Sequence, residues 1–238
     1  WALRDSGVVA TGRDPRKLAA LGAKGLRAVP LDLAHPVPAA DRGRIGPIEA
    51  VVHCAGLSSP WGSTAAFQSA NVDATRHVLD LAASLGAKRF VFVSTASVYF
   101  RFQDQDELRE DDLPPQFINA YAATKRAAEL QVLAQHGLSP IVIRPRGSYG
   151  AGDTTLLPRL LRVAARGPMP RFTPAGATDI THVDDVVAGC MAALDAGPQL
   201  GGKVFNISGG LGVALPDIIA AACEATGVTP RWRHLPFA

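Results

Sequence analysis

Tyr121 and Lys125 are four residues apart, a spacing that places both side chains on one face of an α-helix. An ammonium beside a phenol favours the phenolate, so the tyrosine becomes a usable proton donor or acceptor near neutral pH. Two hydroxyl groups precede the pair, and of these Thr95 is the preferred catalytic candidate, with Ser94 next. Together these groups suit the removal of a proton from an alcohol while a hydride leaves its carbon.

Short apolar runs alternate with longer helical patterns along the chain. The apolar runs predict strands at 8–11, 26–31, 50–54, 90–94, 141–144 and 204–207. The helical patterns predict helices at 15–21, 71–85, 120–135, 156–165, 183–194 and 216–226. Strands that are apolar on both faces and separated by helices indicate a parallel sheet covered on both sides. We therefore expect an α/β fold with a doubly wound parallel sheet.

The sequence changes character after Pro145. Residues 147–178 are rich in Gly, Pro and Arg around one predicted helix, and regular helix and strand patterns resume beyond them. We expect a dinucleotide-binding core over 1–146 and 179–207, which the chain leaves and re-enters. The excursions at 147–178 and 208–238 are expected to form a small substrate lobe.

Ligands of open parallel sheets bind outside the carboxyl ends of the strands. Gly12 and Arg13 end the first predicted strand, where a dinucleotide places its adenosine ribose, and an arginine there suits the 2′-phosphate of NADP. The alternative is a surface arginine in a turn. Asp14 is assigned to capping the following helix, whose first residue is Pro15.

Two further strand ends carry candidate cofactor contacts. Asp32, followed by Leu33, ends the second predicted strand, and its carboxylate is placed to accept a hydrogen bond from an adenine amino group. Cys54, Ala55 and Gly56 end the third, and small residues there let a cofactor approach the backbone. A lone loop aspartate and an ordinary glycine turn are the alternatives.

Composition excludes several classes of function. The net charge of +3 over 238 residues is too small to argue for nucleic acid as a partner. The three cysteines are widely spaced, which fits free thiols in a reducing, cytoplasmic compartment. No apolar run approaches the ~18 residues of a membrane span, and no signal peptide is visible. His53 is expected to be a core histidine, and without a second histidine at ligand spacing we expect no metal site.

Several short motifs, together with Tyr121 and Lys125, resemble the extended short-chain dehydrogenase/reductase superfamily, within the NAD-dependent epimerase/dehydratase family. They lie at 53–56, 71–75, 93–99, 144–150 and 181–187. The resemblance covers nearly the whole chain and implies a Rossmann-type fold. Residues 144–161 are most similar to the branch of 3β-hydroxysteroid and sterol-carboxylate dehydrogenases and bacterial keto-acid reductases. Nucleotide-sugar epimerases usually carry an asparagine just after the strand in this region, and none is present here.

The resemblance implies roles for individual residues. Tyr121 would be the acid/base, and Lys125 would favour its phenolate and hold the nicotinamide ribose. Thr95 falls at the position of the catalytic hydroxyl. Pro145 would line the nicotinamide, and Asn71 would support the site.

Members of this superfamily begin with a strand and a glycine-rich turn that binds the pyrophosphate through backbone N–H groups. Residues 1–7 instead resemble the end of the helix that follows that turn. We expect the natural protein to contain the preceding segment.

The leading expectation is an enzyme, an NAD(P)-dependent oxidoreductase that interconverts a secondary alcohol and a ketone, with NADP favoured over NAD. One alternative is a nucleotide-sugar epimerase or dehydratase that holds its NAD tightly. A second alternative is a non-catalytic dinucleotide-binding protein. The expected partner is a small-molecule substrate, and the resemblance permits a homodimer. Residues 58–67 and 100–117 are expected to set specificity.

Overall fold

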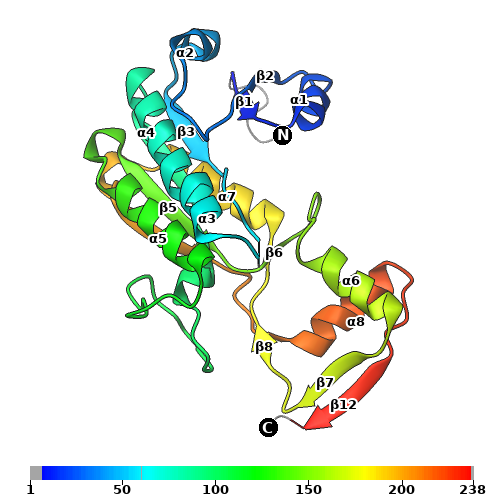
Figure 1. Ribbon diagram of the computed structural model, residues 1–238. Coiled ribbons are helices and arrows are strands. Elements are labelled where there is room, and N and C mark those ends of the chain that lie inside the picture. The colour runs from blue at the N-terminus through cyan, green and yellow to red at the C-terminus, as the bar shows by residue number, and fades with distance from the viewer. Residues whose placement is uncertain (1–6, 60, 237–238) are drawn as a thin grey trace. The chain divides into compact units, whose positions relative to one another are not determined.

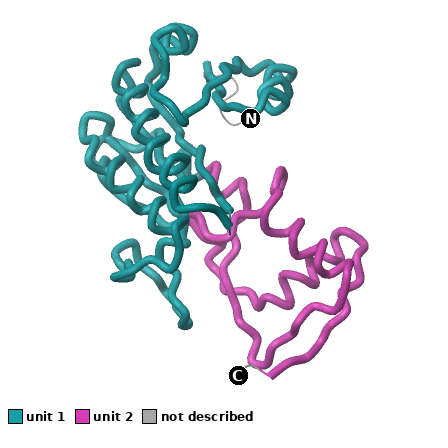
Figure 2. Tube along the Cα trace, viewed as in Figure 1, with its two compact units in different colours: residues 1–144, 189–206 teal, residues 145–188, 207–238 magenta. Residues whose placement is uncertain are grey.

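The computed structural model describes residues 7–59 and 61–236 (Figure 1). Two compact units divide the chain, and each contains two segments (Figure 2). The first unit comprises Trp1–Arg144 and Gly189–Asn206, and the second comprises Pro145–Ala188 and Ile207–Ala238. The helix end predicted at 1–7 lies, up to residue 6, outside the described residues.

Parallel strands form the centre of the first unit. Strands β1 (Val9–Gly12) and β2 (Arg27–Pro30) pair with each other. A second sheet has the order β10-β5-β4-β3. Its strands are β3 (Ala50–His53), β4 (Arg89–Val93), β5 (Pro140–Pro145) and β10 (Lys203–Ile207). Both β3 and β5 run parallel to β4, so their carboxyl ends share one edge.

The strand order follows a doubly wound sheet. That arrangement has the order 3-2-1-4-5-6. The pair β2-β1 corresponds to positions 3-2, and β3, β4 and β5 correspond to positions 4-5-6. Residues 7–59 and 61–236 supply no strand for position 1. The predicted fold class, a Rossmann-type α/β fold with a parallel sheet, is confirmed.

Helices connect the strands of the first unit. They are α1 (Pro15–Gly22), α2 (Ala39–Ile45), α3 (Thr64–Phe67), α4 (Ala74–Ser84) and α5 (Ala120–Leu133), with α7 (Val183–Asp195) leading into β10. Short 3-10 turns lie at η2 (Ala96–Tyr99), η3 (His136–Leu138) and η4 (Pro198–Leu200). The cap predicted for α1 is confirmed, because the carboxylate of Asp14 accepts hydrogen bonds from the backbone N–H groups of Arg16 and Lys17.

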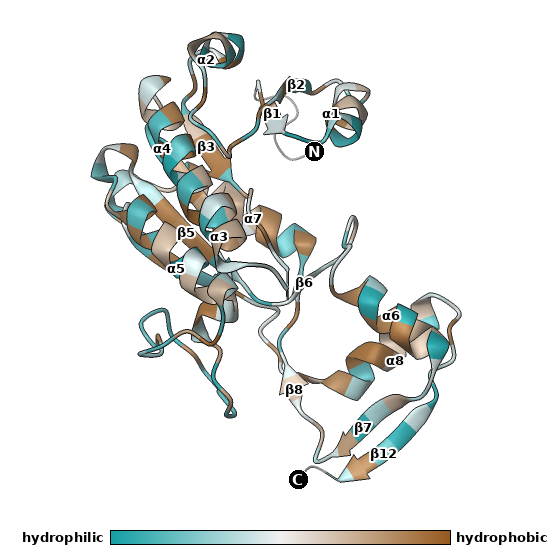
Figure 3. Cartoon of the chain, viewed as in Figure 1, coloured by the Kyte–Doolittle hydropathy of each residue, from teal (hydrophilic) through white to brown (hydrophobic). Residues whose placement is uncertain are grey.

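Helices α4 and α5 pack on β4 and β5 through a hydrophobic core. Figure 3 shows the hydrophobic character of β5. The buried residues of this core are Val78, Leu79, Ala82, Ala87, Phe90, Phe92, Ala128, Val132, Leu138 and Val142. Each large side chain buried in this way stabilises the fold by about 1.5–3 kcal/mol. The core therefore fixes α5, which carries Tyr121 and Lys125, against the sheet.

The segment before α4 is a π-helix, η1 (Gln68–Asp73), which continues from α3. The sequence predicts one regular helix beginning at Asn71, and this expectation is wrong at its start. A π-helical turn is rare and often marks a functional site. Here it carries Asn71, whose side chain is bound outside the helix, as described below.

The second unit is built on two helices and a strand pair. Helix α6 (Leu157–Arg166) packs on α8 (Leu215–Ala225), and β7 (Met169–Thr173) runs parallel to β12 (Trp232–Pro236). The remaining strands are the short pairs β6 (Ser148–Tyr149) with β9 (Thr181–His182), and β8 (Ala177–Thr178) with β11 (Val213–Ala214). None of the described helices in either unit is long and apolar enough to cross a membrane.

Candidate active site

Helix α5 carries Tyr121 and Lys125 in its first two turns. Asn119 caps the helix, because its Oδ1 accepts a hydrogen bond from the backbone N–H of Ala122 at 2.8 Å. Tyr121 is half-buried, whereas Lys125 is buried. The cap fixes the start of the helix, and the helical spacing places the phenol and the ammonium on the same face.

The ammonium of Lys125 is largely desolvated. Its Nζ donates a hydrogen bond to the carbonyl oxygen of Val93 at 2.9 Å and lies 4.1 Å from the centre of the Phe92 ring. Burial lowers the pKa of Lys125 to about 8, while the charges of Glu129 and of ionised Cys54 raise it. Near neutral pH the group is therefore a cation with little water around it. The weak screening strengthens its attraction for a neighbouring anion.

Asn71 connects the loop after β3 to helix α5. Its Oδ1 accepts a hydrogen bond from the backbone N–H of Leu57 at 2.7 Å, and its Nδ2 donates to Thr124 Oγ1 at 3.1 Å. The residue is 1% exposed. Because Thr124 precedes Lys125, this bridge fixes the loop against the turn that carries the ammonium. The supporting role proposed for Asn71 stays a prediction, and this geometry gives it a physical basis.

Gly56 leaves no room for a side chain beside this bridge. A Cβ atom at Gly56 would lie 2.9 Å from Asn71 Oδ1 and 3.9 Å from Lys125 Nζ. Cys54, Ala55 and Gly56 are all exposed at the carboxyl end of β3. Small, exposed residues at a strand end allow a dinucleotide to approach the backbone closely, so this segment fits the cofactor that the sequence predicts.

We expect Gly56→Ala to displace Asn71 and to lower the free energy of unfolding by about 1–3 kcal/mol, the usual cost of overpacking. Dinucleotide affinity should fall in the same variant, because the new methyl group occupies the approach to the backbone. Urea denaturation and calorimetric titration measure the two effects. Gly22→Ala is the matched control, since a Cβ at Gly22 meets nothing within 4 Å. Equal stability and equal dinucleotide affinity in the two variants would contradict the prediction.

The two candidate hydroxyls at the end of β4 have different surroundings. Ser94 is buried, and its Oγ has no hydrogen-bond partner among the described residues. Thr95 is half-buried, and its Oγ1 donates to Ser97 Oγ at 3.1 Å. Thr95 also caps the N-terminus of η2, which contacts α5. Because Ser94 is buried and Thr95 is only half-buried, Thr95 is the more accessible of the two to a substrate.

The phenol ring of Tyr121 lies beside Phe67. Their ring centroids are 6.3 Å apart. A Cβ atom at Gly62 would lie 3.0 Å from Phe67 Cε2, so the loop before α3 rests on this ring. The neighbouring Trp61 is 83% exposed. This loop therefore presents a large apolar side chain close in sequence to the contact that positions Tyr121.

The predicted adenosine-binding residues lie after β1 and β2. Gly12 ends β1, and Arg13 is exposed, with no hydrogen bond or ion pair from its side chain to any described residue. Asp32 is exposed and its Oδ1 accepts a hydrogen bond from the backbone N–H of Ala34 at 3.0 Å. Leu33 is half-buried and packs against the hydrophobic core. The cofactor roles of these residues stay predictions.

His53 is a core residue, as predicted. It is 3% exposed, its Nε2 lies 3.0 Å from Thr75 Oγ1, and its ring stacks on Phe92. Burial, and then the charge of Lys125, lowers the pKa of His53 to about 3, so the ring is neutral and is not a base at neutral pH. Within the described part of the chain, no group of His, Cys, Asp and Glu side chains is arranged to hold a metal ion.

Pro145 is buried at the end of β5 and belongs to the second unit. Its expected place beside a nicotinamide stays a prediction. The residue before it, Arg144, was not assigned a role by the sequence, although an arginine at the end of an otherwise apolar strand is a signal that could have been used. It forms a buried ion pair with Glu129 at 2.7 Å.

These features define a dinucleotide-binding α/β protein with a Tyr/Lys pair at the carboxyl end of its sheet. Residues 2–208 match the NAD dependent epimerase/dehydratase family. The chain belongs to this family, and the resemblance stated from its motifs is confirmed.

Two relatives and one solved structure show the range of this family. The chain is 33% identical to a 2-alkyl-3-oxoalkanoate reductase of Stenotrophomonas maltophilia, over 76% of the chain and 57% of the relative. It is 31% identical to the bovine sterol-4-alpha-carboxylate 3-dehydrogenase (decarboxylating), over 68% of the chain and 48% of the relative. The chain thus spans about half the length of these relatives. The structure of MoeE5 with UDP-glucose and NAD is similar at a TM-score of 0.78 and 29% identity, covering 99% of this chain and 79% of MoeE5.

Proposed function

We propose that this protein is an NAD(P)-dependent oxidoreductase that interconverts a secondary alcohol and a ketone. The observation that carries the proposal is the buried ammonium of Lys125, one helical turn from Tyr121 and bonded to the last residue of β4, Val93. The chain continues from Val93 to the hydroxyl of Thr95. A weakly solvated cation beside a phenol suits proton exchange with the oxygen of an alcohol.

In the direction of reduction, Tyr121 gives its phenolic proton to the carbonyl oxygen of the substrate. Lys125 stabilises the phenolate that remains, and Thr95 donates a hydrogen bond to the same substrate oxygen. Asn71 keeps the loop after β3 and the turn of Lys125 at a fixed separation. When bound, a nicotinamide dinucleotide supplies or accepts the hydride.

NADP is the favoured dinucleotide, and Arg13 is the residue that would recognise its 2′-phosphate. Arg13→Ala should weaken NADP binding about 10–100-fold, since hydrogen bonds to charged groups contribute about 1.5–3 kcal/mol, and should leave NAD binding nearly unchanged. Calorimetric titration with each nucleotide measures both constants. Arg16→Ala, an exposed arginine on α1, is the control. Equal losses for the two nucleotides would refute the preference.

The substrate that we propose is an apolar ketone. Trp61, Phe100 and Phe102 are large exposed side chains, and the rings of Phe100 and Phe102 contact each other with centroids 5.7 Å apart. Phe100 directly follows η2, which begins after Thr95. Both relatives named above carry a 3-oxo or sterol substrate in their names, and such substrates combine a carbonyl group with apolar bulk.

A panel of ketones tests the proposal. The purified protein should oxidise NADPH in the presence of 2-alkyl-3-oxo acids or sterol ketones, and more slowly with a small polar ketone. The absorbance of the reduced nicotinamide reports turnover. Absence of turnover with every ketone, from a protein that binds the nucleotide, would contradict the proposed reaction.

A nucleotide-sugar epimerase or dehydratase is the second candidate. The observation in its favour is the likeness to MoeE5, whose structure holds UDP-glucose and NAD. Such an enzyme uses the same residues but regenerates its cofactor within each cycle. Nucleotide content separates the two candidates, because NAD that survives purification favours the epimerase, whereas an empty site that takes up NADP favours the reductase.

A further inference from the structure

A buried ion pair lies one helical turn beyond Lys125. Glu129 is 0% exposed and Arg144 is 1% exposed. Arg144 Nε donates to Glu129 Oε1 at 2.8 Å, and Arg144 Nη2 donates to Glu129 Oε2 at 2.7 Å. This two-pronged geometry fixes direction as well as distance. The pair joins the middle of α5 to the carboxyl end of β5.

The same arginine continues the network to other elements. Arg144 Nη1 donates to the hydroxyl of Tyr99 and to the carbonyl oxygen of Glu110 at 2.8 Å. Tyr99 in turn donates to Asn206 Oδ1 at 2.7 Å, and the backbone N–H of Asn206 donates to Glu110 Oε1 at 2.8 Å. Asn206 also donates through Nδ2 to the carbonyl oxygen of Leu108 at 3.2 Å.

One ion pair thus connects α5, which bears Tyr121 and Lys125, to η2, which Thr95 caps. Tyr99 closes η2, which starts after Thr95, and Glu129 follows Lys125 on α5. Leu108 and Glu110 lie in the long loop between η2 and α5, residues 100–118. In this network the loop is therefore bonded directly to Arg144 of β5 and to Asn206 of β10. Tyr99 acts on the loop only through the side chain of Asn206.

We propose that Glu129 and Arg144 are positioning residues for the reaction. They hold the helix of Tyr121 and Lys125 against the end of β5, and Arg144 also bonds to the loop at 100–118. The inference rests on the proposed function. Neither residue meets the substrate, because both are buried within the first unit. Glu129 acts on Lys125 from one turn further along α5, and Tyr99 orients the Asn206 side chain that bonds to the loop.

Stability alone is a weak reason for such a pair. Two buried charges lose their hydration, and replacing an ion pair with apolar residues is often neutral or stabilising. The position of Glu129 gives it a further effect, since its negative charge raises the pKa of Lys125 against burial. The other groups that face Lys125 are Cys54, whose ionised form acts in the same direction, and the neutral His53. Glu129 is therefore the anion that most raises the pKa of this ammonium, and it is itself paired with the cations Arg144 and Arg126.

Two conservative variants separate the two arms of the network. Glu129→Gln keeps the size of the side chain and removes its charge, so the pKa of Lys125 should fall and the high-pH loss of kcat should move down by about one pH unit, a typical size for a neighbouring charge. The value of kcat at neutral pH should fall about tenfold. Tyr99→Phe removes the hydroxyl that orients the side-chain amide of Asn206, and with it weakens the bond from Asn206 to Leu108 in the loop. KM for the ketone should therefore rise a few-fold while kcat changes little.

The control is Arg126→Met. Arg126 also contacts Glu129, with Nη1 2.8 Å from Oε2, but its side chain is 21% exposed and its described bond does not extend to β5, η2 or the loop. This variant should keep the wild-type kcat, KM and pH profile. The Tm and the NADP affinity of every variant are measured in parallel. A merely structural role would lower Tm without changing the pH profile of kcat or the ratio of KM to kcat.

Tyr121→Phe in the same series keeps the two proposals distinguishable. An active Tyr121→Phe variant overturns the proposed function. An inactive Tyr121→Phe, together with a wild-type pH profile in Glu129→Gln and a wild-type KM in Tyr99→Phe, overturns the positioning role and leaves the proposed function standing. If Glu129→Gln folds poorly, the KM of Tyr99→Phe decides, because that variant retains the ion pair.

Discussion

Tyr121→Phe is expected to lower kcat about 10²–10⁴-fold, the range that a positioned acid or base contributes. The variant removes only the phenolic oxygen, so no group remains in position to donate a proton to the substrate oxygen. The ring remains, and so does its contact with Phe67 at 6.3 Å between centroids. Steady-state ketone reduction with NADPH measures the effect.

The control for this prediction is nucleotide binding by the same variant. The phenol is proposed to act on the substrate, so the dissociation constant for NADP should stay within about threefold of wild type, well below the tenfold that corresponds to 1.4 kcal/mol. Turnover equal to that of wild type would show that Tyr121 is not the acid. A loss of nucleotide binding as large as the loss of kcat would show that it mainly holds the cofactor.

Lys125→Met is expected to lower kcat about 10²–10³-fold, the cost of removing one preorganised electrostatic group. Methionine retains an unbranched, apolar chain in a site formed by Phe92 and the end of β4. Because the ammonium is held in a desolvated position, its removal relieves a burial penalty, so the free energy of unfolding should stay unchanged or rise. Activity assays and thermal unfolding together test this combination.

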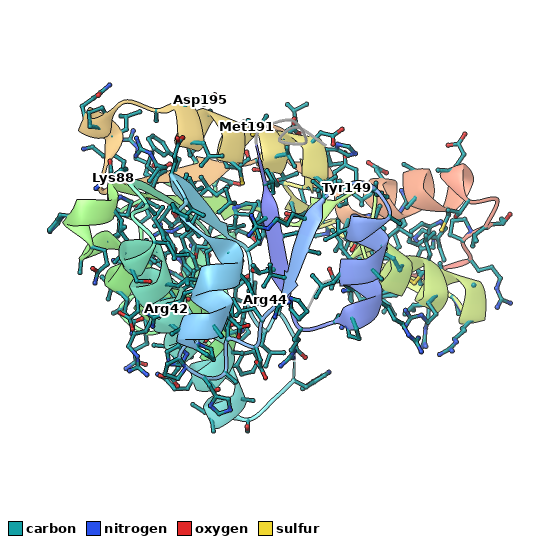
Figure 4. The ribbon with its side chains drawn as sticks, turned by 90° about the horizontal axis from the view of Figure 1, so that it is seen from above. Arg42, Arg44, Lys88, Tyr149, Met191 and Asp195 are labelled. Carbon is teal, nitrogen blue, oxygen red and sulfur yellow. The ribbon has the colours of Figure 1, made fainter. Side chains whose placement is uncertain are left out.

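The matched control is Lys88→Met, which changes an exposed lysine just before β4 that is labelled in Figure 4. It should leave both kcat and Tm unchanged. The prediction for Lys125 fails if its variant loses activity only in proportion to a fall in Tm. That outcome would make the lysine a structural residue.

Hydrophobic periodicity was sufficient to locate most of the first unit. The strands predicted at 90–94 and 141–144 lie on β4 and β5, because both are almost continuously apolar and are buried on both faces. The cap at Asp14 followed from the local preference of a carboxylate for free backbone N–H groups. Apolar spacing and helix capping both depend on residues close in the chain, so they can be identified from a single sequence.

The irregular parts were not predictable in this way. The π-helix at Gln68–Asp73 depends on the side chain of Asn71 reaching the backbone of Leu57, a tertiary contact that leaves no trace in apolar spacing. The small strands of the second unit have two residues each, for example β6 (Ser148–Tyr149), and are too short for an alternating pattern.

The same difference between local signals and long-range contacts applies to the candidate site. Tyr121 and Lys125 could be proposed as a pair because the roles proposed for them depend on spacing within one helix. The pairing of Glu129 with Arg144 could not, since the two residues are fifteen apart and meet only after β5 has joined the sheet beside α5. In the sequence, such a pair is visible only as one charged residue inside each of two apolar patterns.

The most direct test of the central claim follows the hydride itself. The protein is incubated with NADPH deuterated at the reactive ring carbon and with a 2-alkyl-3-oxo acid, and the product is analysed by mass spectrometry and NMR. We predict one deuterium on the former carbonyl carbon in the wild type, and none with Tyr121→Phe on the same timescale. A nucleotide that keeps its deuterium while the substrate is epimerised or dehydrated would contradict the account.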